Sequence, residues 1–567
     1  MPPTAAPPAP HSGPPARRAP VLVLAALLGA VAIAGCGSSH AGGTSADPAG
    51  VIPSGAAVYL GATVRPNGSE ATAALAAGRA LTHQANPFPR LLALLRTPGS
   101  PPLDYKTEVA PWLGPHAGLF LTSDAGASSM LALAEATVTN STSSATLSFG
   151  AGQADGAIVM DTRDSSAART FLARQAGLAG AHPAVYRGIS YEATAGGPAF
   201  GLIGRFAVIG SEAGLRAVID TTQGAAALTT ASGYAKLTQS APADALANLY
   251  IGPAAGAGPR GIPGLLEALT GGREADISLQ AAAGSLTLDA DTLATPGTRA
   301  GLLTPDPEGS EALAALPGES WLAVGLGHLA TNLQTDVAAL KGITGLLGSE
   351  RSSGLGTLLE GLLGPVELLG ANTAEARADF GAWERSAGIF AAGAGLLELK
   401  GGIVITSSDP ARSRAAVEKL GALLSNRGDS VSPASIPGTE AAISARLRSF
   451  PLALDIAAGR GSDGNAKFIL GLGTASVLAA LSPTQTLSSS ATRAAAASAL
   501  GGIAPSLILQ LPTLIGLLEG IGVTESPPIS TYLPYLRSVT NLSGGGRELG
   551  GGVERFRLVL GLVQSGG

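Results

Sequence analysis

Apolar residues alternate with small or polar residues in short runs along most of the chain, and glycines separate these runs. The stretches 183–210 and 276–293 each contain such runs joined by tight turns with glycine. Alternation with a period of two predicts β-strands, and tight turns between them predict hairpins. Apolar segments that follow an Asp predict single helices between the strands. The pattern therefore predicts an α+β fold with antiparallel sheets and helices packed on one face.

The same order of elements occurs in both halves of the chain. A proline-led strand at 52–62 is matched by one at 316–326, and Trp112 in VAPWLGPHAGLF is matched by Trp383 in FGAWERSAGIF. Two further pairs of matched stretches continue this order, AIVMDTRDSSAARTFL with GIVITSSDPARSRAAV and GRFAVIGSEAGLRAVI with NAKFILGLGTASVLAAL. A last pair matches IPGLLEAL with LPTLIGLLEG. Repetition in one order predicts an internal duplication.

The duplication sets the expected domain organisation. We expect two similar lobes, a first α+β repeat at 51–300 and a second at 312–567, joined by a linker at 301–311 that is rich in helix breakers. In each repeat a strand leads into an Asp, Asp164 or Asp409, that is expected to cap the following helix. Trp112 and Trp383 occupy equivalent places, which favours a role in the core over a role in binding.

The N-terminal region has the order of a secretory signal. Arg17 and Arg18 precede an uncharged apolar run from Val21 to Gly35, and small residues precede Cys36. Fifteen residues of helix reach about 22 Å, short of the roughly 30 Å hydrocarbon core of a membrane. We therefore expect residues 1–35 to be a signal peptide that is removed.

The end of this signal, Ile33-Ala34-Gly35-Cys36, resembles the lipobox of bacterial lipoproteins. The resemblance implies that Cys36 receives a diacylglyceryl group and becomes the first mature residue. Residues 36–50 are polar and small, which predicts a flexible tether to an extracytoplasmic body anchored to the cell membrane. The alternative is a secreted or membrane-anchored protein in which Cys36 is incidental.

Composition excludes several classes of function. Cys36 is the only cysteine, so no disulfide is available within the chain. The formal net charge is −5 and no basic stripe is present, which argues against nucleic-acid binding. The six histidines include no pair three or four residues apart, which argues against a zinc site of ordinary spacing. They are His11, His40, His83, His116, His182 and His328. We expect no metal and no cofactor.

Two short motifs suggest chemistry. Residues 256–261, GAGPRG, fit a dinucleotide-binding pattern, but Pro259 removes an N–H donor and a plain loop is the favoured interpretation. SLTLDADTL at 285–293 is similar to the first motif of haloacid-dehalogenase-type phosphatases, which implies Asp289 as nucleophile and Asp291 as acid and base. That chemistry needs a parallel sheet and a following helix, whereas a breaker-rich segment follows here.

The stretches IPSGAAVYLGATVRP and DYKTEVAPWLGPHAGLFL resemble a family of bacterial extracytoplasmic proteins of unknown function, which implies no catalytic residues. A Gly- and Ser-rich insertion at 122–156 departs from that pattern. We expect a membrane-anchored envelope lipoprotein that acts as a non-catalytic binding or interaction module. One alternative is a carrier of an apolar, lipid-like ligand held by the apolar stretches 354–370 and 506–523 or by a cleft between the two lobes. The other is a metal-dependent phosphate-ester hydrolase at Asp289 and Asp291.

Overall fold

The computed structural model describes residues 46–82, 103–123, 149, 155–255, 272, 274–293, 305–329, 380–395, 397–448, 452–520, 522–525 and 529–563. Its strands in the first half are β1 Val58–Thr63, β2 Leu113–Leu121, β3 Gly156–Thr162, β4 His182–Tyr186, β5 Ile189–Ala193, β6 Pro198–Ile203, β7 Phe206–Ser211, β8 Ala247–Ile251, β9 Ala275–Ala282 and β10 Ser285–Leu293. Those in the second half are β11 Ser320–Leu326, β12 Glu384–Ala392, β13 Lys400–Ser407, β14 Ser430–Pro433, β15 Thr439–Arg446, β16 Ala453–Arg460, β17 Ala466–Leu472, β18 Leu507–Gln510, β19 Val539–Gly550 and β20 Val553–Leu562.

Helices connect many of these strands. They are α2 Gly68–Thr82, α5 Ser165–Ala179, α6 Glu212–Thr222, α7 Ser232–Thr238, α9 Pro307–Ala314, α13 Pro410–Asn426, α14 Thr474–Leu481, α15 Ala491–Ala499, α16 Leu511–Gly520 and α17 Ile529–Arg537. Short helical turns are η1 Pro48–Gly50, η3 Tyr105–Val109, η4 Leu228–Thr230, η5 Pro253–Ala255, η7 Leu487–Ser489 and η8 Val523–Glu525. Among the described helices, none is both long and apolar enough to cross a membrane.

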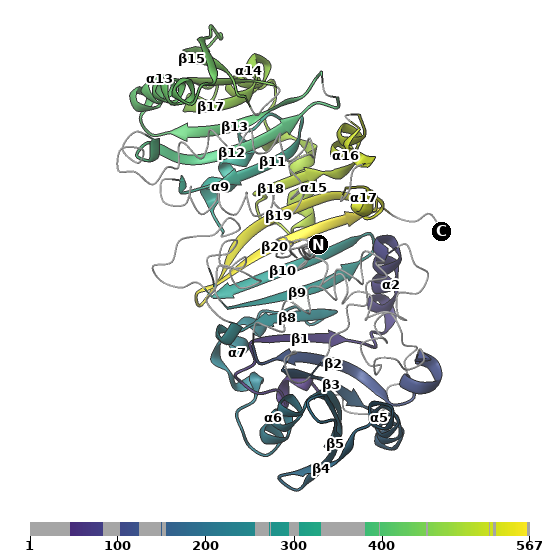
Figure 1. Cartoon of the computed structure of the whole chain (residues 1–567). Coiled ribbons are helices and arrows are strands. Elements are labelled where there is room, and N and C mark those ends of the chain that lie inside the picture. The colour runs from purple at the N-terminus through teal and green to yellow at the C-terminus, as the bar shows by residue number, and fades with distance from the viewer. Residues whose placement is uncertain are drawn as a thin grey trace, which may run out of the picture.

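All 20 strands belong to one antiparallel sheet, which runs the length of the molecule (Figure 1). From the centre to one edge the order is β10-β9-β8-β1-β2-β3-β7-β6-β5-β4. From the centre to the other edge it is β20-β19-β18-β11-β12-β13-β17-β16-β15-β14. Each strand of the second half thus occupies the place of the strand numbered ten lower in the first. The two halves of the sheet meet where β10 pairs with β20.

Helices cover both faces of this sheet. Ile158 and Met160 of β3 belong to a core cluster with side chains of α2, α5, α16 and α17. Val159, which points to the opposite face, belongs to a different cluster with side chains of α6 and α7. In the second half, Ile403 packs with α13, whereas Val404 on the other face packs in a cluster with α9, α14 and α15. The molecule therefore has a helix layer on each side of the sheet.

The prediction of two similar lobes with helices on one face is wrong. The hairpins expected at 183–210 and 276–293 are present, but β10 pairs along its whole length with β20, so one sheet continues through the middle of the chain. Every residue of β3 is buried, as expected of a strand covered on both faces. The fold is thus a single sheet-rich body in which the pairing of β10 with β20 joins the two halves.

Candidate functional site

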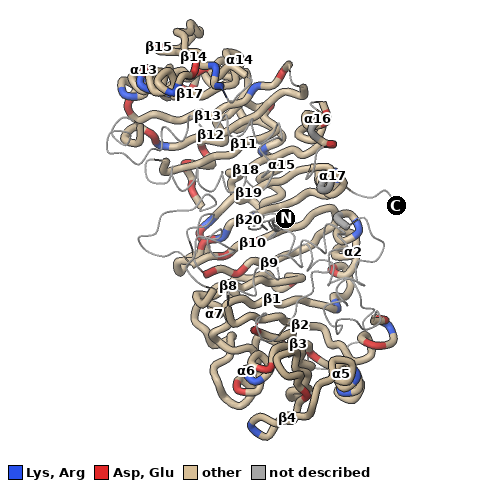
Figure 2. The backbone as a smooth tube through the Cα atoms, in the orientation of Figure 1, with Lys and Arg blue, Asp and Glu red and all other residues tan. Residues whose placement is uncertain are grey.

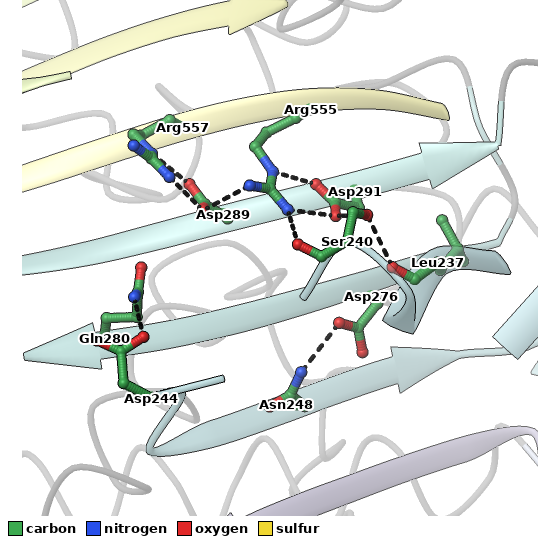
Figure 3. A network of polar contacts seen from close by, with 10 residues as sticks. All are labelled: Leu237, Ser240, Asp244, Asn248, Asp276, Gln280, Asp289, Asp291, Arg555 and Arg557. Carbon is green, nitrogen blue, oxygen red and sulfur yellow. Dashed lines mark hydrogen bonds and ion pairs between the residues drawn. The ribbon is translucent and has the colours of Figure 1, made fainter. Parts of the chain in front are cut away.

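A group of charged residues lies in the middle of the sheet, on the neighbouring strands β9, β10 and β20 (Figure 2). Cross-strand pairing places Asp276 of β9 opposite Asp291 of β10, and Asp291 opposite Arg555 of β20. In the adjacent row, Asp289 of β10 lies opposite Arg557 of β20. Residues two apart on a strand project from the same face, so all five side chains gather on one side of the sheet (Figure 3). We call these five residues the central polar cluster.

The two arginines hold both carboxylates of β10. Arg557 forms a bidentate pair with Asp289, with Nε and Nη2 each 2.7 Å from a carboxylate oxygen. Arg555 forms a second bidentate pair with Asp291, at 2.6 Å from Nε and 2.7 Å from Nη2. Its Nη1 also lies 3.3 Å from Oδ2 of Asp289. Paired, charge-assisted bonds of this kind are the strongest side-chain hydrogen bonds in proteins, so the four groups form one fixed unit.

The chain segment after α7 closes over this unit. The hydroxyl of Ser240 donates to Oδ2 of Asp291 at 2.8 Å, and the carbonyl of Ser240 accepts from Nη2 of Arg555 at 2.7 Å. Asp289, Asp291 and Arg555 are 1%, 2% and 5% exposed. The hydrogen bond to the Asp291 carboxylate raises the pKa of Arg555 further above its ordinary value, so the guanidinium stays charged despite burial. The cluster is therefore a buried ionic network.

Asp276 is the member of the cluster without an arginine of its own. Its side chain is 1% exposed, Oδ2 accepts from Nδ2 of Asn248 at 3.1 Å, and Oδ1 has no hydrogen-bond partner. Burial raises the pKa of Asp276 to about 7, and the neighbouring Asp291 carboxylate adds to the rise, whereas the hydrogen bond from Asn248 and the charge of Arg555 oppose it. Ionisation of this carboxyl therefore falls near neutral pH.

The predicted catalytic pair, Asp289 and Asp291, is present, and arginines bind both carboxylates. Asp289 and Asp291 do project from one face of a strand, as their spacing predicts. However, β10 is antiparallel to both of its neighbours and lies in the middle of the sheet, and arginines occupy both carboxylates. A nucleophilic carboxylate must have an oxygen free to approach phosphorus. Both carboxylates are also buried, so neither lies at a solvent-exposed strand end.

The tryptophans lie in the core at matching places. Trp112 directly precedes β2, and the centroid of its ring lies 5.0 Å from that of the Phe171 ring on α5. Trp383 directly precedes β12 and packs 5.2 Å from Phe468 on β17. They are 1% and 0% exposed, as expected of core residues.

The predicted helix caps are confirmed. The carboxylate of Asp164 accepts from two backbone N–H groups at the start of α5, and that of Asp409 does the same for α13. The stretch 506–523 contains β18 and α16, in which Leu511, Ile515 and Leu518 are buried. These apolar side chains of α16 are therefore part of the core.

Other predicted positions give no site or lie outside the described residues. Within the described ranges, no group of three or more His, Cys, Asp or Glu residues is arranged to hold a metal ion. His328 has its Nδ1 2.8 Å from Oδ2 of Asp306, a contact that raises its pKa. The positions outside the described residues are Cys36, His11, His40, His83, residues 256–261 and residues 354–370.

Sequence reasoning missed several charged residues of low exposure, among them the buried Arg555 and Glu384 and the half-buried Arg557. Arg555 and Arg557 alternate with apolar residues in VERFRLVL, a period-two pattern that places both on one strand face. Glu384, which follows Trp383 at the start of β12, is 3% exposed, and neither carboxylate oxygen has a hydrogen-bond partner. Burial alone raises the pKa of Glu384 to about 8. Arg385 and Ser386 follow it in the sequence, so the local pattern does not indicate that Glu384 is buried.

Comparisons with known proteins place the chain in a family without assigning an activity. No curated protein matches it. A solved structure described as "Structure of crystal form I of TP0453" is similar at 12% sequence identity over 45% of this chain and 81% of that chain, with a TM-score of 0.25, which carries no conclusion. The expected resemblance to a family of unknown function is confirmed. A family model described as "Protein of unknown function (DUF3352)" matches residues 19–502, most of the chain, and the chain therefore belongs to that family.

Proposed function

We propose that this protein is a lipoprotein of the cell envelope, anchored through Cys36, whose folded body is a non-catalytic binding or interaction module. The proposed lipid anchor is supported by the order of the N-terminal signal. A basic pair, an apolar run and small residues precede the only cysteine. Pro48 and Ala49 are buried, so the proposed tether lies before them in the chain.

We also propose that the body arose by duplication of one unit. Matched residues make matched contacts in the two halves. Pro53 forms an isolated antiparallel bridge with Ala227 in the first half. Pro317, its counterpart in the repeat, forms the same kind of bridge with Thr486. Together with the matching strand order, these bridges support two copies that share one sheet.

The contacts of the acidic pair Asp289 and Asp291 support a non-catalytic role. The acidic pair that resembles a phosphatase motif is bound by Arg555 and Arg557 within a buried network. The network ties β10 to β20 and so holds the halves of the sheet together. We assign the proposed binding role to the folded body as a whole.

Lipidation is the first testable consequence. Metabolic labelling of producing cells with a fatty-acid analogue is expected to label the wild-type protein, since diacylation needs the Cys36 thiol. The Cys36→Ser variant is expected to lose the label completely and to move from the membrane fraction to the soluble fraction. Equal labelling of the two proteins would refute the anchor, because the chain has no other cysteine.

The alternative of a phosphate-ester hydrolase has its own test. With Mg²⁺ and p-nitrophenyl phosphate, the purified protein is expected to show no turnover above that of an Asp289→Asn variant, because the carboxylate of Asp289 is held by two arginines. Turnover that requires Mg²⁺ and disappears in Asp289→Asn would contradict the non-catalytic proposal.

A further inference from the structure

We propose that the charges of β10 and β20 select which strands pair at the centre of the sheet: they allow β10 to pair with β20 and oppose pairing of β10 with β10, or β20 with β20, of a second copy of this chain. The proposal concerns self-association and is independent of the lipid anchor.

One ion pair lies at the centre of the pairing between β10 and β20. Asp289 is the fifth residue of β10 and Arg557 is the fifth residue of β20, and the two lie directly opposite each other. Both strands follow a two-residue turn from the preceding strand, at residues 283–284 and 551–552. The fifth position is therefore the centre of the pairing between two strands that hold equivalent places in the sheet. A strand paired with its own copy in this register would place its fifth residue opposite itself.

Pairing of either strand with the same strand of a second copy would bring equal charges together. Two β10 strands in this register would place Asp289 opposite Asp289, and two β20 strands would place Arg557 opposite Arg557. In either case Asp291 or Arg555 would also lose its charged partner, because each lies opposite the other only in the mixed pair. Like charges directly opposite on a sheet are destabilising, and like-charge contacts across an interface exclude wrong partners.

Selection of the correct partner strand matters because β10 precedes β20 by a long stretch of chain. β10 ends at Leu293, whereas β20 begins at Val553, near the C-terminus. In the finished protein, β10 has β9 on one side and β20 on the other. Until β20 is available, one edge of β10 is open, and an open edge is a template for pairing with another chain. The open edge of a second copy at the same stage is one such template.

This role differs from a contribution to stability. Buried ion pairs are often neutral or unfavourable for stability relative to apolar residues of similar size, and in some proteins they serve specificity instead. Asp289 and Arg557 can therefore be replaced together, with Asp289→Leu and Arg557→Met, to remove the charge clash of like pairing without leaving an unpaired charge. A role in selection and a role in stability predict opposite results for this double variant.

The test compares refolding of full-length chains, all with Cys36→Ser, after dilution from denaturant, with mass measured by light scattering. The double variant is expected to unfold at the same or higher denaturant concentration than its parent, yet to form about tenfold more two-chain and larger species on refolding, as expected for the loss of a clash of one to two kcal/mol. A matched control neutralises an exposed ion pair between α16 and α17, with Glu519→Gln and Arg537→Gln, and is expected to refold like its parent.

A second variant keeps the test decisive if the apolar pair does not fold. Asp289→Asn with Arg557→Gln removes the same charges and keeps polar groups, and it is expected to show the same increase in two-chain species. Refolding of both neutral variants to the parent's distribution of species would overturn the proposal. Lower stability without new species would also overturn it, because that result assigns the pair a structural role only.

Discussion

Replacement of Arg555 by methionine is expected to lower the free energy of unfolding by about 3–5 kcal/mol, the usual effect of removing one partner of a buried ion pair. The variant leaves the Asp291 carboxylate, which is 2% exposed, without its bidentate partner, and it also removes the contact to Asp289. Ser240 loses the donor to its carbonyl. Urea unfolding at pH 7, followed by circular dichroism, measures the effect.

Two controls separate the buried charge from the general effect of losing an arginine. Arg537→Met removes an exposed partner of Glu519 and is expected to change stability by less than about 1 kcal/mol. Arg555→Met combined with Asp291→Leu removes both charges of the buried pair and is expected to recover most of the loss. An equal effect of Arg555→Met and Arg537→Met would show that the network contributes nothing specific to stability.

Local features of this fold could be predicted from the sequence because they depend on neighbouring residues. Asp164 and Asp409 cap their helices through side-chain oxygens that reach N–H groups two and three residues ahead. The hairpin at 276–293 forms around a turn at Gly284, whose positive φ of 79° suits glycine. Such contacts need no knowledge of distant parts of the chain.

The central junction could not be predicted because its partners are far apart in sequence. Asp291 and Arg555 are separated by 264 residues, and neither strand indicates its partner. Seen alone, two aspartates at the end of an apolar strand resemble a catalytic motif. Seen with β20, they are one side of an ion-pair network, so the meaning of the motif depends on topology.

The sequence of β3 indicates that helices cover both faces of the sheet, although it lacks the period-two alternation on which the prediction relied. GAIVMDT of β3 is a continuous buried run and lacks the alternation of a half-exposed strand. Such a run is typical of a strand covered on both faces, and it indicates helix layers on both sides of the sheet. The error about one helix face therefore came from applying the rule for half-exposed antiparallel sheets to a strand that does not fit it.

The stability of the folded protein is expected to fall as pH rises between about 4 and 7, in part because of Asp276. Its pKa in the folded state is about 7, whereas the ordinary value for the unfolded chain is 3.8. Within this window the folded state retains a proton that the unfolded state has released, so raising the pH favours unfolding; above about pH 7 the penalty is constant. Three pKa units at about 1.4 kcal/mol each set its scale at roughly 4 kcal/mol.

Asp276→Asn tests this expectation, since an amide keeps the shape of the side chain and does not titrate. The variant is expected to match the wild type near pH 4 and to be more stable at pH 8 by several kcal/mol, measured by urea unfolding across the range. Tyr59, Tyr234 and Tyr250 near Asp276 stay neutral throughout, because burial raises the pKa of each above its ordinary value.

Glu384 provides the matched control for that experiment. Its pKa is raised to about 8 by burial in the other half of the sheet, away from the central polar cluster, so Glu384→Gln is expected to remove a slope of the same sign that extends to a higher pH. The two variants lie too far apart to share partners, so their effects are expected to add. An Asp276→Asn variant that keeps the full wild-type slope between pH 4 and 7 would show that Asp276 is ionised in the folded state throughout, and that the arginines of the cluster neutralise three carboxylates rather than two.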